Sequence, residues 1–199
     1  MEIVIATRNP KKFRELKSLL AIPGVRWRSL ASFPRVPTAR ETGRTFEQNA
    51  IKKALAVART TGRLAIADDS GLEVDALNGA PGVRSARFAG RHGDDRANYT
   101  KLLKLLKGRA PRARTARFRC SLALANPSRC LAVTRGELFG RITHAAKGHR
   151  GFGYDPVFLV PRLGKTVAQL PLSVKNRISH RAKAAAPMRR ALQLLVTSH

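Results

Sequence analysis

The sequence predicts an α/β fold, in which a mixed β-sheet carries helices on its faces. The first half of the chain alternates short apolar segments with amphipathic helical segments, in the order strand, helix, strand, helix. A hairpin with apolar–polar alternation follows, and the tail has a helical pattern. The length of 199 residues suits one domain, residues 1–199, with a sizeable core.

A tight turn joins the first strand to the first helix. Residues 2–7 (EIVIAT) form a short apolar run, and Pro10 stands in the first turn of a helix, where its missing N–H costs nothing. The helix has one apolar face, made by Phe13, Leu16, Leu19 and Leu20. Residues 22–40 have an irregular pattern, with a short strand near residues 26–30.

A second helix begins at Thr45, whose spacing to Gln48 is that of a capping box. Its apolar stripe consists of Phe46, Ala50, Ala54, Val57 and Ala58. Residues 64–67 predict a second short strand that ends at Asp68. A glycine–proline turn at residues 79–82 follows, and then a helix that Asp94 or Asp95 can cap.

The strongest strand pattern covers residues 116–124, where apolar and polar side chains alternate. A turn at residues 126–129 and a strand at 131–134 complete a hairpin. Residues 140–154 are predicted as a loop and residues 156–160 as a short strand. The helical tail from Ser173 contains Pro187, and because proline costs about 3 kcal/mol in a helix interior, we expect a break or a kink there.

The charge of the chain is its most unusual property. It has 39 Lys and Arg against 12 Asp and Glu, a net charge of +27, and the only acids after Asp95 are Glu137 and Asp155. This charge predicts attraction to polyanions such as nucleic acid, anionic membranes or polyphosphate. The alternative is a solvated basic surface unrelated to the activity.

Several classes of protein are excluded. No run approaches the roughly 18 apolar residues of a membrane span, and the N-terminus lacks the pattern of a signal peptide, so we expect a soluble cytoplasmic protein with no membrane partner. The two cysteines, Cys120 and Cys130, make neither a disulfide framework nor a zinc site. We expect buried free thiols, although the two can also face each other across the hairpin.

Acidic residues are scarce, so the positions that keep them are informative. Asp68 and Asp69 are adjacent at the predicted carboxyl end of a strand, where α/β sheets bind ligands. Such a pair can hold Mg²⁺ together with substrate phosphates, or one carboxylate can accept a proton from water. The alternative is an ordinary turn, since DDSG is good turn chemistry.

Three further groups are candidates for binding. Thr7, Asn9, Lys11 and Lys12 lie at a helix N-terminus, which suits phosphate; the alternative is an ordinary helix start. The segment GFGYDP at residues 151–156 has glycines that admit a ligand, an aromatic ring that can stack on a base and an acid, but it also fits a tight turn with packed aromatics. The third group, which can equally be a solvated basic face, is Lys175, His180 and Arg181.

Together these segments resemble the inosine triphosphate pyrophosphatases, which hydrolyse non-standard purine nucleoside triphosphates. The resemblance rests on five segments in the family's order, which cover nearly the whole chain: ATRNPKKFRELKSLL from Ala6, ETGRTFEQNAIKKA from Glu41, AIADDSGLEVDALNGAPGVRSARFAG from Ala65, GFGYDPVF from Gly151 and SVKNRISHRAKA from Ser173. It implies an elongated α/β fold with two lobes and the active cleft between them. It also implies a homodimer and Mg²⁺-dependent hydrolysis of ITP, dITP and XTP to the monophosphate and pyrophosphate.

The resemblance also implies roles for particular residues. Asp69 is expected to be the catalytic base, and the metal ligands are Glu41, Asp68 and Asp69. The implied substrate-binding residues are Thr7, Arg8, Asn9, Pro10, Lys11, Lys12, Lys53, Ser70, Phe152, Gly153, Tyr154, Asp155, Lys175, His180 and Arg181. The chain departs from the family at Gln169 and Val174, where an acid is usual, and at Pro187.

Two other functions compete with this one. A basic nucleic-acid-binding protein on the same scaffold, with weak or lost catalysis, would account for the charge of +27. Such a protein has no use for Glu41, Asp68 and Asp69, which repel phosphate without a metal, so their presence favours the enzyme. A related pyrophosphatase for modified pyrimidine or methylated nucleotides would differ in base specificity.

Overall fold

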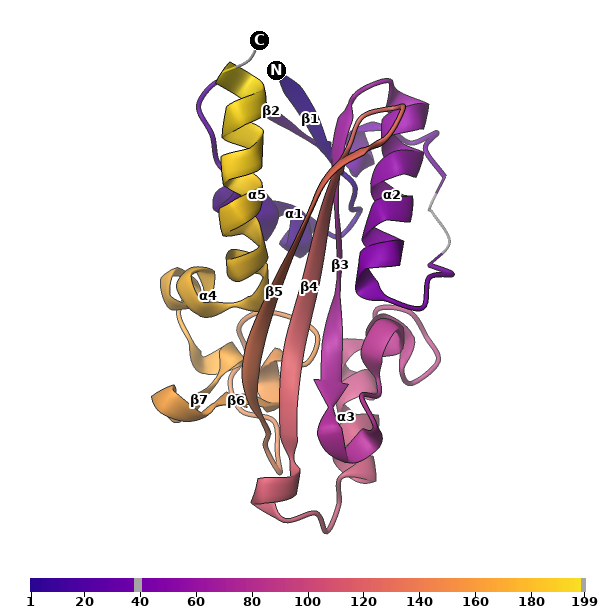
Figure 1. Cartoon of the computed structure of the whole chain (residues 1–199). Helices are drawn as coiled ribbons and strands as arrows, with labels where there is room; N and C mark the ends of the chain where they lie inside the picture. The colour runs from indigo at the N-terminus through magenta and orange to yellow at the C-terminus, as the bar shows by residue number, and fades with distance from the viewer. Residues whose placement is uncertain (38–40, 198–199) are drawn as a thin grey trace. The chain divides into compact units, whose positions relative to one another are not determined.

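The computed structural model describes residues 1–37 and 41–197 and contains a seven-stranded sheet in the order β2-β1-β3-β4-β5-β6-β7 (Figure 1). The strands are β1 (Glu2–Ile5), β2 (Arg26–Ser29), β3 (Leu64–Val74), β4 (Thr115–Ala125), β5 (Cys130–Ile142), β6 (Phe158–Val160) and β7 (Lys165–Thr166). The α-helices are α1 (Pro10–Leu19), α2 (Phe46–Thr61), α3 (Asp95–Leu105), α4 (Leu172–Ile178) and α5 (His180–Thr197). Strand β1 pairs in parallel with β2 and β3, whereas β6 is antiparallel to β5 and β7, so the predicted mixed sheet is confirmed.

The chain forms two compact units. Unit 1 consists of residues 1–69, 120–136 and 180–199, and unit 2 consists of residues 70–119 and 137–179. Strands β3, β4 and β5 each contribute residues to both units. That the chain is a single pyrophosphatase domain, residues 1–199, stays a prediction.

Unit 1 has a layered core on both faces of its part of the sheet. Large side chains of β1, β3 and β4, such as Ile5, Ile66 and Leu122, pack against α1 and α5. The intervening residues point to the other face, where Ala65 and Ala123 meet the alanines of α2. This division follows from the two-residue period of a strand. Figure 1 shows α1 and α5 on one side of these strands and α2 on the other.

Unit 2 has one core cluster between its part of the sheet and α3. The rings of Phe118 on β4 and Phe158 on β6 belong to this cluster, and their centroids lie 4.3 Å apart. Arg114 is 2 % exposed, and its guanidinium donates to the carbonyl oxygens of Leu106, Ile142 and Thr143 at 2.6–2.8 Å. Because these three carbonyls come from different segments, Arg114 ties the end of α3 to the end of β5.

Several predicted elements have different bounds in the structure. Strand β3 does not end at Asp68 but continues to Val74, so both aspartates lie inside it. Strand β5 runs to Ile142, three residues into the predicted loop, and residues 155–157 form a 3₁₀ turn before β6. Strand β2 and the Asp94 cap agree with the predictions. Residues 38–40 of the stretch predicted as irregular lie outside the described residues.

Of the break or kink expected at Pro187, the break is wrong and the kink stays a prediction. Helix α5 continues through Pro187, and the helical tail is interrupted instead at Ser179, whose backbone is extended. Proline removes the hydrogen bond to the carbonyl four residues earlier, at Lys183. Pro187 is exposed, and α5 tolerates it without an interruption.

The cysteines and the membrane prediction have clear outcomes. Cys120 is buried and Cys130 is half-buried, and both thiols are free. Burial raises the pKa of Cys120 well above its usual value, and the adjacent Asp68 adds to this effect. Within the described part of the chain, no helix has the length and apolar character needed to cross a bilayer.

Candidate active site

The turn between β1 and α1 is organised by Asn9. Its Oδ1 atom accepts from the backbone N–H of Lys11 at 2.9 Å and of Lys12 at 3.2 Å, which caps the helix. The Thr7 hydroxyl accepts from the N–H of Asn9 at 3.2 Å, and Pro10 begins the helix as predicted. The turn therefore holds Lys12 in a defined position at the start of α1, whereas Lys11 is exposed.

Asp68 lies in a buried cluster of charges on the α1 and α5 side of β3. Its Oδ1 atom is 2.6 Å from Nζ of Lys12, and its Oδ2 atom is 3.2 Å from Nε of Arg181. Arg181 also donates to Glu15 at 3.5 Å, and the Cys120 thiol lies 3.3 Å from Oδ2 of Asp68. Burial opposes ionisation, but Lys12 and Arg181 outweigh it and hold the pKa of Asp68 well below its usual value.

Asp69 has a different set of partners, supplied by α2 and the segment before it. Its Oδ1 atom is 2.6 Å from Nζ of Lys53, and its Oδ2 atom accepts from Nδ2 of Asn49 at 3.2 Å. Lys53 also lies 3.2 Å from Glu41. Burial raises the pKa of Asp69, Lys53 opposes the rise only in part, and the negative Glu41 adds to it.

The two adjacent aspartates therefore have opposite electrostatic environments. Successive side chains of a strand point to opposite faces, so Asp68 faces α1 and α5 while Asp69 faces α2. Asp68 is stabilised as an anion by two cations, whereas burial outweighs Lys53 at Asp69, so the pKa of Asp69 is raised and its proton affinity is the higher of the two. A raised carboxylate pKa is a property expected of a proton acceptor.

The chemistry of the donor set fits a hard divalent cation. Glu41, Asp68 and Asp69 offer carboxylate oxygens. The Lys53 ammonium lies between Glu41 and Asp69, as a metal ion between two carboxylates would. Among the described residues, no three acidic, histidine or cysteine side chains converge on one point. Glu41 and Asp69, which share Lys53, are suitable ligands by their chemistry, whereas Asp68 faces the other side of β3 and pairs with Lys12.

Unit 2 contains the second group of predicted residues. Lys175 is buried, its Nζ atom lies 2.8 Å from Oδ2 of Asp155, and it sits 4.8 Å from the centre of the Phe152 ring. Asp155 also accepts from the N–H of Phe152 at 3.0 Å. A Cβ atom on Gly151, whose φ is +79°, would lie 2.0 Å from Asp155, so this position requires glycine.

The other predicted residues are divided between the units. Arg8 donates to the carbonyl of Val36 at 2.7 Å, and His180, 4 % exposed, is the first residue of α5; both belong to unit 1. Ser70 is half-buried in β3 of unit 2. Tyr154 is buried in the core of unit 2, and its hydroxyl donates to the carbonyl of Ser85 at 2.9 Å. Burial raises the pKa of Tyr154, which therefore stays neutral.

Sequence reasoning missed four residues of these clusters. Glu15 and Asn49 are buried, and each lies one helical turn from a predicted lysine, at spacings of three from Lys12 and four from Lys53. A polar residue on an apolar helical face was the signal that would have found them. The other two are Cys120, whose thiol contacts Asp68, and Asp95, which accepts from the N–H of Gly153. Both contacts join segments far apart in the sequence, so only the tertiary structure reveals them.

Two departures from the family's pattern have structural roles. The Gln169 side chain forms a capping box with Thr166, accepting from the N–H of Thr166 at 2.9 Å. Val174 packs against the core of unit 2.

Comparison with known proteins identifies the family. Residues 3–191 match the Ham1 family. The chain belongs to the Ham1 family. A curated relative from Desulforamulus reducens, named dITP/XTP pyrophosphatase, is 51 % identical over 98 % of this chain and 96 % of its own length. A dITP/XTP pyrophosphatase from Bacillus subtilis is 47 % identical over 96 % of this chain and 97 % of its own length.

Solved Ham1 structures have the same fold. The Ham1 protein of Staphylococcus aureus is 41 % identical, with a TM-score of 0.86, and covers 97 % of this chain and 98 % of its own. A Ham1 protein from Coxiella burnetii is 40 % identical, with a TM-score of 0.87 and the same coverage of both chains. The resemblance seen in the sequence is therefore confirmed.

Proposed function

We propose that this chain hydrolyses the non-standard purine nucleoside triphosphates ITP, dITP and XTP to the monophosphate and pyrophosphate. The observation that carries the proposal is the pair of lysine–aspartate contacts, Lys12–Asp68 and Lys53–Asp69, each 2.6 Å long, in a chain of the Ham1 family. Relatives about half identical over nearly the whole chain are named dITP/XTP pyrophosphatases, which supports this substrate class. The enzyme is then a hydrolase that cleanses the nucleotide pool.

The lysines bind the triphosphate in this proposal. The ammonium groups of Lys12 and Lys53 already sit beside carboxylates, and negative phosphate oxygens are further partners for them. Thr7, Asn9 and Lys11 extend the phosphate site along the start of α1, where the helix dipole favours anions. Positive charge at these positions stabilises the pyrophosphate as it leaves.

Asp69 is the proposed base. Its carboxylate accepts a proton from the attacking water, and Asn49 and Lys53 hold its two oxygens in place. Asp68, kept ionised by Lys12 and Arg181, is less suited to take the proton. In this proposal Asp69 accepts the proton, and Asp68 remains a permanently negative group.

Nucleotide pyrophosphatases generally use a divalent metal, and we assign Mg²⁺ to this one. The carboxylates of Glu41, Asp68 and Asp69 are the residues that would hold it, because Mg²⁺ prefers oxygen ligands and shares them with phosphates. When bound, the metal supplies positive charge that neutralises the phosphate oxygens.

Two groups of residues are proposed for recognition of the base, and each group lies within one unit. The Phe152 ring is proposed to stack on the base. Asp155 accepts from the N–H of Phe152 and pairs with Lys175, whose ammonium lies over the ring. His180 and Arg181 carry donors suited to the C6 carbonyl of hypoxanthine and xanthine, a position where adenine has a donor of its own. Leaving that donor unpaired costs about 1–3 kcal/mol, which favours ITP over ATP.

A pyrophosphate-release assay tests the function. Purified protein is given ITP, XTP, dITP, ATP and GTP, with Mg²⁺ or with a chelator. We expect rapid release of pyrophosphate from ITP, XTP and dITP, and only when Mg²⁺ is present. Equal rates with ATP and ITP, or rates that the chelator leaves unchanged, would contradict it.

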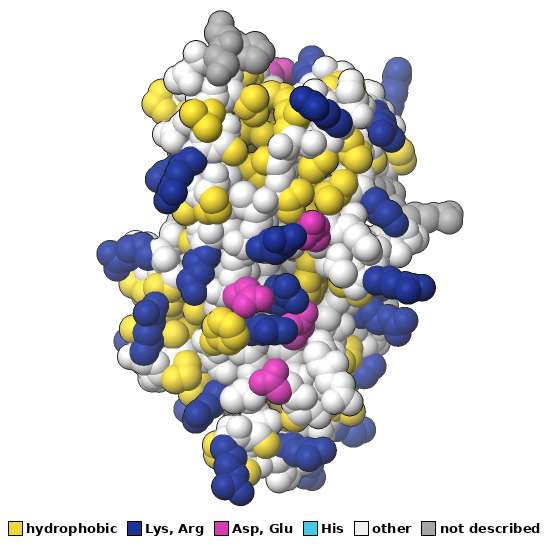
Figure 2. Space-filling view, in the orientation of Figure 1, with side chains coloured by type: hydrophobic (Ala, Val, Ile, Leu, Met, Phe, Trp, Pro, Cys, Tyr) yellow, Lys and Arg dark blue, Asp and Glu magenta, His cyan; other side chains and the backbone are white. Residues whose placement is uncertain are grey.

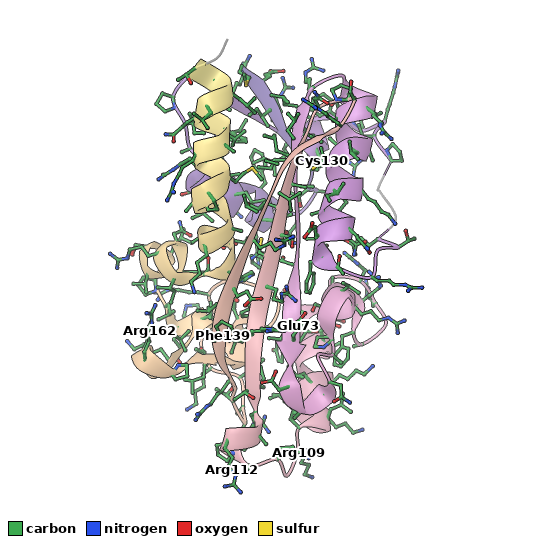
Figure 3. All side chains as sticks on the ribbon, viewed as in Figure 1. Glu73, Arg109, Arg112, Cys130, Phe139 and Arg162 are labelled. Carbon is green, nitrogen blue, oxygen red and sulfur yellow. The ribbon has the colours of Figure 1, made fainter. Side chains whose placement is uncertain are left out.

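A homodimer is the proposed assembly, and one surface of unit 2 supports it. Phe139 on β5 is 63 % exposed, and Figure 3 shows it on the same side of the sheet as Glu73 on β3. On the same three strands of unit 2, Arg117 and Arg119 on β4 pair with Glu73 and Glu137 at 2.7–3.2 Å. This surface is nearly neutral, so a second copy can approach it although the chain carries a charge of +27. Sedimentation equilibrium of Phe139→Asp, expected to be monomeric, tests this.

The cytoplasm is the proposed location of this enzyme.

Non-specific binding to nucleic acid is a second proposed property. Figure 2 shows Lys and Arg side chains scattered over the drawn face rather than gathered in one groove. In unit 2, the exposed residues Lys104, Lys107, Arg109 and Arg112 follow one another at the end of α3, and Figure 3 shows the last two at that end. A dispersed basic surface supports attraction to any polyanion rather than recognition of one sequence.

A further inference from the structure

The segment of residues 151–155 is held by two carboxylates from different parts of unit 2. Asp155, within the segment, accepts from the N–H of Phe152 at 3.0 Å. Asp95, at the start of α3, accepts from the N–H of Gly153 at 2.7 Å. Two adjacent backbone amides thus each donate to an anion, and such hydrogen bonds are about twice as strong as neutral ones. Together they fix the orientation of the peptide bond that follows Phe152.

This segment needs external support because its own residues restrict it poorly. Gly151 and Gly153 both have positive φ, at +79° and +63°, and glycine has the greatest backbone freedom to lose on ordering. Lys175 approaches the Phe152 ring from one side and is itself held by Asp155. Asp95 is a partner of Gly153 that comes from a helix outside the segment.

Capping of α3 does not account for Asp95. The N-cap of this helix is Asp94, whose Oδ1 atom accepts from the N–H of Ala97 at 2.9 Å. Asn98 fastens the start of the same helix by accepting from the N–H of Ala89 at 2.7 Å and donating to the carbonyl of Ala86 at 3.3 Å. The helix start is thus fixed by neighbours of Asp95, and the Asp95 carboxylate is directed to Gly153.

We propose that Asp95 is a positioning residue for base recognition: it fixes Gly153 and thereby the Phe152 ring in the place where a purine stacks. The inference rests on the proposed function, because it assigns the 151–155 segment to the base of the substrate. Asp95 itself touches neither the phosphates nor the reacting atoms. Its effect is therefore confined to nucleotides and absent for inorganic triphosphate.

Kinetics of Asp95→Ala test the proposal. The variant is expected to raise the KM for ITP about tenfold, the effect of losing one hydrogen bond to a charged group, with kcat changed less than about twofold. Inhibition of ITP hydrolysis by inorganic triphosphate keeps its inhibition constant. Asp95→Asn retains an acceptor oxygen, so its KM returns to within about threefold of the wild-type value.

Asp94→Ala is the matched control. It removes the cap of the same helix, at the neighbouring position, and leaves the bond to Gly153 in place. It is expected to lower the thermal midpoint without changing the KM for ITP. Backbone amide exchange supplies a readout independent of activity: deuterium uptake in a peptide covering residues 151–155 is expected to accelerate in Asp95→Ala and to stay unchanged in Asp94→Ala.

Two results would overturn the proposal while leaving the proposed function intact. One is a wild-type KM for ITP in Asp95→Ala, and the other is an equal loss of affinity for ITP and inorganic triphosphate. A wild-type protein that does not hydrolyse ITP would instead overturn the proposed function. In that case unchanged amide exchange in Asp95→Ala would also overturn the anchoring role of Asp95.

Discussion

The Nε atom of Arg181 lies 3.2 Å from Oδ2 of Asp68, and both side chains are almost completely buried. Glu15 accepts from the same guanidinium at 3.5 Å, and Lys12 lies 2.6 Å from the other oxygen of Asp68. Two buried acids are thus balanced by two bases. Because a buried charge is costly without its partners, this cluster must form as a unit, and it joins α1, β3 and α5 of unit 1.

The first prediction concerns the stability of this cluster. Arg181→Met leaves Asp68 and Glu15 without a shared cation, and we expect it to lower the free energy of unfolding by about 3–5 kcal/mol. Glu15→Gln should lower the free energy of unfolding less in the Arg181→Met variant than in the wild-type protein, because the guanidinium that donates to Glu15 is absent there. Urea unfolding of the two single variants and the double variant measures this coupling. Strictly additive losses would show that Glu15 and Arg181 act independently.

The second prediction separates catalysis from binding at Asp69. Asp69→Asn removes the proposed base but leaves Lys12 and Lys53, so we expect kcat for ITP to fall at least about a hundredfold. Binding of ITP, measured by equilibrium dialysis, should change only a few-fold. Lys53→Met is the contrasting variant, in which binding weakens because an ammonium group is lost. A near-normal rate in Asp69→Asn would assign the base to another carboxylate.

The third prediction is that the two aspartates affect stability in opposite directions. The pKa of Asp68 is lowered in the fold, so its ionised form stabilises the protein above the pKa of the unfolded chain, and this contribution disappears as the pH falls through the lower folded value. Asp68→Asn should therefore destabilise the protein at pH 7 and lose this effect in strong acid.

The pKa of Asp69 is raised, so its ionisation costs stability once the pH exceeds the unfolded value. Asp69→Asn should stabilise the protein at pH 7. Thermal midpoints measured from strong acid to pH 8 with a chelator present would decide both cases, and a loss of stability in Asp69→Asn at neutral pH would contradict this one.

The fourth prediction concerns Asn49, which sequence reasoning missed. Its Nδ2 atom donates to Asp69 at 3.2 Å, and its Oδ1 atom accepts from the N–H of Gly43 at 2.7 Å. Asn49→Ala should lower kcat for ITP about tenfold by releasing one oxygen of Asp69, with little change in KM. Gln48→Ala, at the neighbouring exposed position of α2, is the control and should keep kcat unchanged. Equal effects in the two variants would point to the helix start rather than to Asp69.

The fifth prediction concerns the charge of +27. Affinity for DNA or RNA should collapse between low and moderate salt, because it depends on counterion release. Hydrolysis of ITP should fall only modestly over the same range, since the contacts around Asp68 and Asp69 are short and buried and are screened less. Filter binding and pyrophosphate release over one salt series compare the two. An oligonucleotide that stays bound at high salt, together with no ITP hydrolysis, would favour the nucleic-acid-binding function.

Local sequence patterns were sufficient for most of the fold. The apolar run of β1, Pro10 at the start of α1, the Thr45 cap of α2 and the alternation of β4 each act within a few residues, so each could be predicted from its neighbours. The bounds of β3 and β5 could not. Both strands extend beyond their apolar patterns because pairing within the sheet satisfies the backbone whatever the side chain.

The sequence by itself determined which chemical groups this protein has and in which segments they occur: the aspartate pair, the lysines near two helix starts, the glycine-rich segment and the family to which these belong. Only the tertiary structure decided which groups meet. Because a strand alternates its faces, the adjacent Asp68 and Asp69 have different partners and opposite pKa shifts. Arg181 reaches Asp68, and Asp95 reaches Gly153, across 113 and 58 residues, because packing and not sequence order brings side chains together.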